Sequence, residues 1–529
     1  MPDTVEPATA SQKAFASSKT FLARAPDPNV FRLRAIIVIV VLAFFFIGVP
    51  ILNVAGVVQD YKVNILGKYL SYAILALGID LIWGYTGLLS LCQALFFCIG
   101  GYIMAMHLSV AQGGGDVRPE YNYIPQFMFF NNVKVLPLFW TPFTSMTLTL
   151  IAGFTLPALA GATFGFFILR SRVRGVYFSI VTQALAWAAF LLISRNEMLL
   201  GGTNGLTNFY KPMIQARSWI IGLYLLTLVM LVLAYLLCFW IVRSRLGRVL
   251  VAIRDKETRL YFAGYKPYVF KVFAFAVAAM LGGVGGMLYS PQVGIITPQN
   301  MSVEESIFMV VWVALGGRGK LWGAVFGAML VLVARSSLTS DLSSAWMVVL
   351  GATAICAVLL FPEGFVGLWA KLERQITIGE PIGRILTTAI PIIAVSTFVL
   401  SEVLGLTPQS LASPLPTSVS MGALRFALLV AAAVLLYPMR HQRLKIRIAC
   451  SLAAICFLIL SFVAGPVSRF LLSLVTVSLP IKYWLMIAVL VVAGVLNYTQ
   501  SRTDKFAAKA RGFAVGPAES AAEVGTVKA

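Results

Sequence analysis

The sequence predicts an all-α polytopic membrane protein with about 14 transmembrane helices. Of its 529 residues, 59% are hydrophobic and only 12% are charged, whereas soluble globular proteins are about 25% charged. Apolar runs long enough to cross a bilayer core of about 30 Å as helices recur along the chain. The net charge of +21 is concentrated in short segments between those runs, which is typical of membrane proteins. A water-soluble enzyme and a nucleic-acid-binding protein are therefore both disfavoured.

Ten of these helices are predicted within residues 33–370, which we interpret as one core. Residues 1–32 are polar and rich in Ala, Ser and Pro, so we expect a flexible cytoplasmic tail there. One run, 303–316, is short and ends in a Gly-Gly-Arg-Gly segment. We expect it to be a tilted or broken span whose backbone is buried in protein. The longer core runs are 33–52, 63–83, 88–110, 143–169, 175–194, 218–242, 269–289, 320–338 and 344–362.

A charged break at 371–384 separates this core from a second membrane region. Residues 371–529 are predicted to form a C-terminal membrane extension of about four spans, followed by a polar cytoplasmic tail from about 498. The short apolar piece at 467–480 is not counted as a span. The four predicted spans are 385–405, 421–438, 446–465 and 482–497.

The distribution of Lys and Arg predicts the orientation. These residues gather in alternate loops, which the positive-inside rule places in the cytoplasm. Both termini are then cytoplasmic (N-in/C-in), and a shift by one span would reverse the distribution downstream. The basic clusters assigned to the inside include Arg170, Arg172 and Arg174; Arg243, Arg245, Arg248, Arg254, Lys256, Arg259 and Lys266; and Arg440, Arg443, Lys445 and Arg447.

The sequence contains no catalytic constellation. Its two His residues are far apart, its six Cys residues lie in or beside apolar runs, and no phosphate-binding loop is present. The clustered ligands that a metal site needs and the paired side chains that acid–base catalysis needs are therefore missing. We expect no enzyme activity, no catalytic residue and no metal site. Uphill transport would need an ion gradient or a separate ATPase. Asp80 is the one clear ionisable candidate inside a core span, which is a weak basis for ion coupling.

The segment from Arg248 to Phe262 is predicted to be a short amphipathic helix on the cytoplasmic side. Apolar residues recur there at helical spacing, and Gly264 and Pro267 end it. Such a helix could lie at the lipid headgroups. The interleaved acids Asp255 and Glu257 favour a protein partner, since headgroup helices normally carry cations alone on the polar face.

Over about residues 65–370, the sequence resembles a known family. It is similar to the M-type permease subunits (C-type for urea) of ABC importers of the branched-chain amino acid and urea class. Several details resemble the urea branch more closely, such as Gly264-Tyr265-Lys266-Pro267. Cys92 replaces the Gly that the family usually has, and the extension has no usual counterpart. The motifs are Gly84-Tyr85-Thr86-Gly87-Leu88-Leu89-Ser90-Leu91, Arg172-Val173-Arg174-Gly175-Val176-Tyr177-Phe178-Ser179-Ile180, Gly201-Gly202-Thr203-Asn204-Gly205-Leu206-Thr207 and the loop from Arg248 to Pro267.

Neutral hydrogen-bonding side chains follow the glycines where one span gives way to the next. An opened backbone there must line a polar path, because lipid cannot satisfy its polar groups. Such a lining suits urea without any charge, whereas a zwitterionic amino acid would more naturally require a charge or a helix N-terminus at each end. Alternatively, these side chains fasten helices together. The candidate path residues are Thr86, Ser90, Gln93, Thr182 and Gln183.

The resemblance implies a permease subunit of an ATP-driven importer in the bacterial inner membrane, working by alternating access. The implied partners are a second homologous permease, two cytoplasmic ATPases that bind the ATP and Mg²⁺, a periplasmic solute-binding protein, and membrane lipid; this chain itself would hold no cofactor. The expected solute is urea or a similar small amide. Branched-chain amino acids are the alternative, and an ion-coupled carrier or channel is the alternative of another class. The implied ATPase-coupling residues are Arg248, Arg254, Asp255, Glu257, Arg259 and Gly264, and the external loop residues for the binding protein are Gly202, Asn204 and Gly205.

Overall fold

The computed structural model describes residues 42–341, with gaps at 57, 111–123, 126, 129–132, 134, 172, 174, 208 and 210–215, and a few positions beyond (351, 364–367, 370 and 372). The predicted tail 1–32, most of the span 344–362 and nearly all of the extension 371–529 lie outside the described residues. The count of about 14 spans and the N-in/C-in orientation therefore stay predictions.

The chain divides into two compact units, residues 1–51 with 416–469 and residues 52–415 with 470–529. The described part of the first unit is 42–51, where a π-helix (Phe44–Gly48) leads into α3 (Val49–Val54). The described part of the second unit is helical apart from its connections and one isolated bridge between Leu206 and Ile296.

Within the described residues, six helices are long and apolar enough to cross a membrane, which confirms helices at six of the predicted runs. They are α4 (Asp60–Thr86), α5 (Gln93–Val110), α7 (Met146–Arg170), α8 (Val176–Ile193), α9 (Arg217–Arg243) and α11 (Pro267–Val293). The other elements are η3 (Thr141–Thr144), η4 (Asn196–Met198), η5 (Gly202–Asn204), α10 (Arg245–Phe262), η6 (Pro298–Met301), α12 (Val303–Gly316) and α13 (Leu321–Asp341).

Two helix boundaries bear directly on the sequence predictions. The short run predicted at 303–316 is the helix α12, with the same bounds. The span predicted from residue 88 begins only at Gln93, because α4 ends at Gly87 with φ +77° and the chain then runs without helix to Cys92. Glycine adopts this left-handed backbone without steric cost, so the glycine marks a real interruption.

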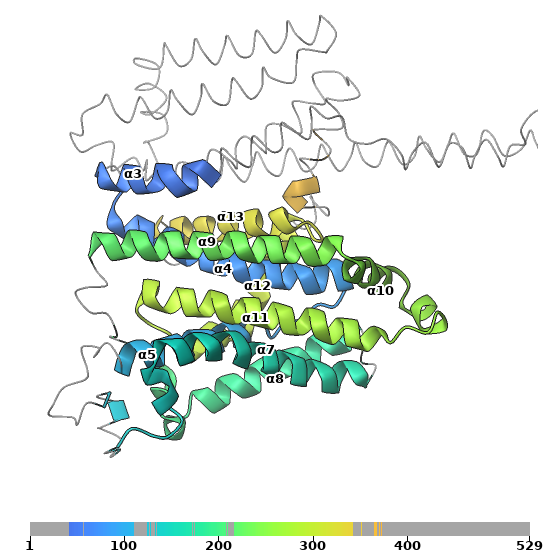
Figure 1. Ribbon diagram of the computed structural model, residues 1–529, viewed down its shortest axis with the longest axis horizontal. Helices are drawn as coiled ribbons and strands as arrows, with labels where there is room; N and C mark the ends of the chain where they lie inside the picture. The colour runs from blue at the N-terminus through green and yellow to red at the C-terminus, as the bar shows by residue number, and fades with distance from the viewer. Residues whose placement is uncertain are drawn as a thin grey trace, which may run out of the picture. The chain divides into compact units, whose positions relative to one another are not determined.

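Helix α11 is the centre of the second unit. It packs most extensively against α4, α5 and α7 (Figure 1), through a face of small residues. A β-carbon placed on Gly286 would overlap the carbonyl oxygen of Phe97, and one on Gly100 would overlap that of Gly283. Small residues allow such close approach where van der Waals packing, not water exclusion, holds membrane helices together.

The helices differ in how much of their surface the protein covers. In the apolar windows of α4 and α5, 89% of the residues are buried, against 22% in α7 and α8 and 33% in α9. The outer helices expose large apolar side chains such as Trp187, Leu233 and Trp240. Such exposed apolar faces are expected where helices meet lipid or another membrane protein.

Candidate functional site

Helix α10 lies beyond the ends of α9 and α11 and connects them (Figure 1). Its apolar face is docked on the membrane helices: Leu250 and Ile253 are buried and form one cluster with Leu81, Ile241 and Ala274, from α4, α9 and α11. The Ser244 hydroxyl caps the helix by accepting from the N–H of Leu246, at 3.1 Å. The amphipathic helix predicted from the sequence is therefore present, and it begins slightly earlier.

Two charged side chains of α10 turn toward the membrane helices. Lys271 Nζ of α11 donates to Glu257 Oε1 at 2.7 Å, and the two side chains are only 6% and 16% exposed. Arg254 Nη1 donates to the carbonyl oxygen of Gly84 in α4 at 2.8 Å, while its Nε pairs with Asp255 at 3.1 Å. These contacts tie α10 to α11 and α4 in addition to its apolar packing.

The remaining residues of the predicted coupling surface face outward. Arg248, Asp255, Arg259 and Gly264 are exposed, and Gly264 has φ +80° just beyond the end of α10. The backbone of the helix departs from helical geometry at Lys256, with φ −151° and ψ 73°. The predicted set therefore divides into two anchors, Arg254 and Glu257, and an outward surface available to a partner.

The carboxylate of Asp80 is buried near the contact between Arg254 and Gly84. Its Oδ1 accepts from the N–H of Gly319 at 2.7 Å, and its Oδ2 has no hydrogen-bond partner among the described residues. Gly319 follows α12, so Asp80 joins α4 to the connection between α12 and α13. Arg254, which bonds Gly84 one turn further along α4, brings α10 to the same place. Three segments far apart in the sequence thus converge at the end of α4.

Replacing Arg254 with Met is expected to loosen α10 from α4, because the Gly84 carbonyl loses its side-chain donor. Hydrogen–deuterium exchange measured on the purified protein should show amides of 245–262 exchanging several-fold faster. Arg248→Met is the matched control, since Arg248 is exposed on the same helix. Equal exchange in the Arg254 variant and the wild type would contradict this anchoring role.

The predicted path residues are only partly brought together. Thr182 Oγ1 of α8 accepts from the N–H of Leu91 at 3.1 Å, and Gln93 Nε2 donates to Ser90 Oγ at 3.3 Å. The Thr86 hydroxyl instead bonds its own helix, at the carbonyl of Ile82. Ser90, Gln93 and Thr182 are buried, and Gln183 is half-buried.

These contacts favour a fastening role for Thr182, which satisfies the open backbone between α4 and α5 together with Ser179, whose Oγ donates to the Leu89 carbonyl at 2.8 Å. A role in lining the path stays open for Gln93, because its Oε1 is buried and has no hydrogen-bond partner in the described part of the chain. The lining role of all five residues stays a prediction.

The predicted external loop is fixed in place by its glycines. Gly202 and Gly205 are buried with φ +58° and +68°, and the following Leu206 exchanges both backbone hydrogen bonds with Ile296. Of the three predicted contact residues, Asn204 is the one whose side chain is exposed. A binding protein at this loop would therefore meet Asn204 and the glycine backbone.

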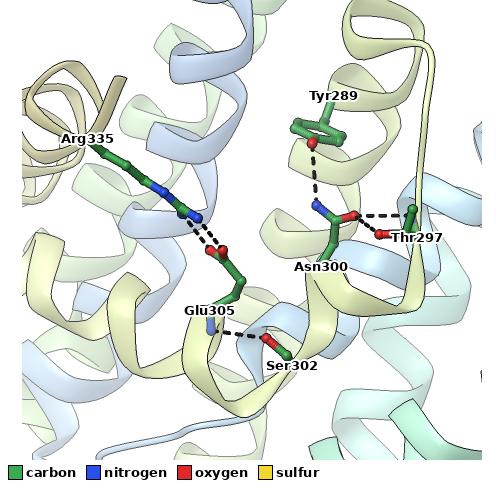
Figure 2. Close-up of polar contacts among 6 residues, drawn as sticks. All are labelled: Tyr289, Thr297, Asn300, Ser302, Glu305 and Arg335. Carbon is green, nitrogen blue, oxygen red and sulfur yellow. Dashed lines mark hydrogen bonds and ion pairs between the residues drawn. The ribbon is translucent and has the colours of Figure 1, made fainter. Parts of the chain in front are cut away.

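One polar cluster was not predicted from the sequence, and it shows that Asp80 is not the one charged group within the core helices. Glu305 of α12 accepts two hydrogen bonds from Arg335 of α13, at 2.7 and 2.9 Å, and Asn300 Nδ2 donates to the Tyr289 hydroxyl (Figure 2). Lys68 of α4 and Lys271 of α11 are also within membrane helices. These residues are visible in the sequence as isolated charges within apolar runs. Their pairing could not be predicted, because the partners of Lys271 and Arg335 are 14 and 30 residues away.

Residues 61–358 match the family described as the permease component of branched-chain amino acid transport systems. The chain is 28% identical to the high-affinity branched-chain amino acid transport system permease protein LivM of Escherichia coli K12, over 64% of this chain and 78% of that protein. It is 26% identical to the probable LivM of Methanocaldococcus jannaschii, over 50% and 77%, and 20% identical to the ribose import permease protein RbsC of Haemophilus influenzae, over 38% and 64%. No solved structure matches.

The expected closeness to the urea branch has no support in these relatives, since the two LivM proteins are named for branched-chain amino acids. The family match covers more than half of the chain and includes α10 and its anchors. This multi-pass inner-membrane protein belongs to the family of permease components of branched-chain amino acid transport systems.

Proposed function

We propose that this chain is the permease subunit of an ATP-driven importer of branched-chain amino acids, and that a cytoplasmic ATPase moves it through α10. The observation that carries the coupling role is the double anchoring of α10, by Arg254 to α4 and by Glu257 to α11. A force applied to the exposed face of α10 would reach both inner helices directly. The substrate class is taken from the names of the LivM relatives.

In the mechanism we propose, the outward residues Arg248, Asp255 and Arg259 contact the ATPase, and closure of two ATPases displaces α10. The contact between Arg254 and Gly84 passes this displacement to the end of α4. From there the bond between Asp80 and Gly319 passes it to the connection between α12 and α13. Alternating access then arises as these inner helices tilt against a second, homologous permease subunit. A periplasmic solute-binding protein would deliver the solute at the loop around Asn204.

The test is uptake by proteoliposomes that contain this chain with its second permease and two ATPases, supplied with the binding protein and ATP. We expect ATP-dependent uptake of radiolabelled leucine, isoleucine or valine, and no uptake when the ATPases are omitted. Uptake of urea in preference to leucine would overturn the substrate assignment. Uptake by this chain alone, driven by an ion gradient, would overturn the importer assignment and favour a carrier.

A further inference from the structure

Four helices of this chain converge on a cluster of three charged side chains. Lys68 comes from α4, Glu305 from α12 and Arg335 from α13, and the ring of Tyr289 from α11 is beside them. Lys68 lies eight residues into α4, about 12 Å along the helix at 1.5 Å per residue. Charged groups at such a depth are costly unless they are paired, and they commonly mark a substrate path.

The pairing within this cluster is uneven. Arg335 binds Glu305 through both guanidinium nitrogens Nη1 and Nη2, at 2.9 and 2.7 Å (Figure 2). This two-pronged geometry occupies both carboxylate oxygens. Lys68 has Arg335 and Glu305 as its charged neighbours, but among the described residues its Nζ makes no ion pair. Its contact is with the Tyr289 ring, whose centroid is 5.9 Å away.

Two further buried hydrogen-bond donors lie on α12, the helix that carries Glu305. Ser306, next to Glu305, is 3% exposed and Trp312 is 0% exposed. Neither the Ser306 hydroxyl nor the Trp312 Nε1 has a hydrogen-bond partner in the described part of the chain. A buried donor without a partner costs about 1–3 kcal/mol. Lys68 and Arg335 are two cations beside the single carboxylate of Glu305, so this cluster carries an excess positive charge that an anion would neutralise.

Aromatic rings surround the same place. Tyr72 stacks on Phe97 with ring centroids 4.9 Å apart, meets Trp312 edge-on at 5.2 Å, and contacts Tyr289 in a tilted arrangement at 5.3 Å. The rings come from α4, α5, α11 and α12, so they form a firm apolar wall beside the charged groups. Such walls with a few polar groups are typical of small-molecule sites.

We propose that Lys68 binds the carboxylate of the transported α-amino acid, with Ser306 as a further donor and the ring cluster around Tyr72 in contact with the aliphatic side chain. This assignment rests on the proposed function and adds the substrate residues to it. Arg335 holds Glu305 through one hydrogen bond to each carboxylate oxygen, and each oxygen keeps a second acceptor site that the substrate ammonium group would use. Lys68 belongs to a helix covered on several sides by this chain's own helices, which favours a solute over an acidic side chain of the second permease.

The test compares Lys68→Met with Lys68→Arg in the complete transporter in nanodiscs, without binding protein, by titration with radiolabelled leucine. We expect Lys68→Met to weaken leucine binding at least tenfold and Lys68→Arg to retain most of it. Leucinamide, which has no carboxylate, should compete poorly with leucine for the wild type. In the Lys68→Met variant, leucinamide and unlabelled leucine should compete with radiolabelled leucine to the same extent. Lys62→Met is the control, since it removes the same charge from the same helix.

Three results would overturn this assignment. Unchanged leucine binding by Lys68→Met, in a wild type that transports leucine, would refute the site while leaving the proposed function intact. Loss of the second permease from the purified Met variant would show that Lys68 contacts that subunit instead. A wild-type transporter that neither binds nor transports leucine would refute both proposals. If Lys68→Met fails to reach the membrane, Ser306→Ala is the second variant, and we expect it to weaken leucine binding at least threefold.

Discussion

Gly286→Ala is expected to prevent accumulation of the folded subunit. A β-carbon at this position would overlap the carbonyl oxygen of Phe97 and lie 2.8 Å from the N–H nitrogen of Gly101, both backbone atoms of α5. Main-chain atoms cannot relieve a clash by changing rotamer as a side chain can, so α5 and α11 would have to move apart where they are in contact. Overpacking typically costs about 1–3 kcal/mol, and we expect this case at the upper end or beyond, because it moves two helices.

The measurement is the amount of monodisperse protein after detergent extraction, with its thermal unfolding midpoint. Gly222→Ala is the matched control, since a β-carbon on this α9 glycine would have no atom of a neighbouring element within 4 Å. The control should be as stable as the wild type or more stable, because Ala is favoured over Gly inside a helix by about 1 kcal/mol. A Gly286→Ala protein with the yield and midpoint of the wild type would show that α5 and α11 are not packed this closely.

Glu257→Lys is expected to reduce ATP-driven uptake at least tenfold, by placing two cations at a nearly buried contact. Removing one partner of a buried ion pair costs about 3–5 kcal/mol, and Lys271 is only 6% exposed here. Helix α10 would then lose its contact with α11, although the rest of the subunit is folded. Uptake is measured in the reconstituted transporter and normalised to the amount of subunit in the membrane.

The exchanged variant, Glu257→Lys with Lys271→Glu, should recover a large part of the uptake, because the pair is restored with opposite polarity. Asp255→Lys is the control for stability: its side chain is 60% exposed, so the unfolding midpoint should not change. If the exchanged variant is as inactive as Glu257→Lys, then Glu257 acts through a partner subunit and not through Lys271.

The helical bundle could be predicted from the sequence because its signal is local. A run such as 218–242 is apolar over a length that fits the bilayer, and its helix, α9, extends over Arg217–Arg243. The periodicity of 248–262 likewise predicted α10, and the glycines near 84–87 predicted an interruption that the structure has at Gly87. The family resemblance rested on such local motifs, and the family match confirmed its coarse part.

The roles of individual residues were harder to predict. The predicted contact of Arg254 and Glu257 with an ATPase stays a prediction, and the structure adds that each of them bonds a helix of this chain. Thr182 accepts from the backbone N–H of Leu91, a contact that spacing did not predict, and its lining role stays a prediction. In each case the residue type was suited to its role, but the partner is 14 to 170 positions away in the sequence. Spacing within one helix carries no information about such a partner.

The sequence by itself determined that this protein is helical and membrane-embedded, since hydrophobic length and charge distribution depend only on neighbouring residues. Its short local motifs carried the resemblance to a permease family, which the family match confirmed. Tertiary structure alone decided which charges are anchors, which glycines admit another backbone, and that Lys68, Glu305 and Arg335 from three helices meet beside one aromatic cluster. The physical reason is that hydrogen bonds and ion pairs act over a few ångströms in space, and only packing brings distant segments within that range.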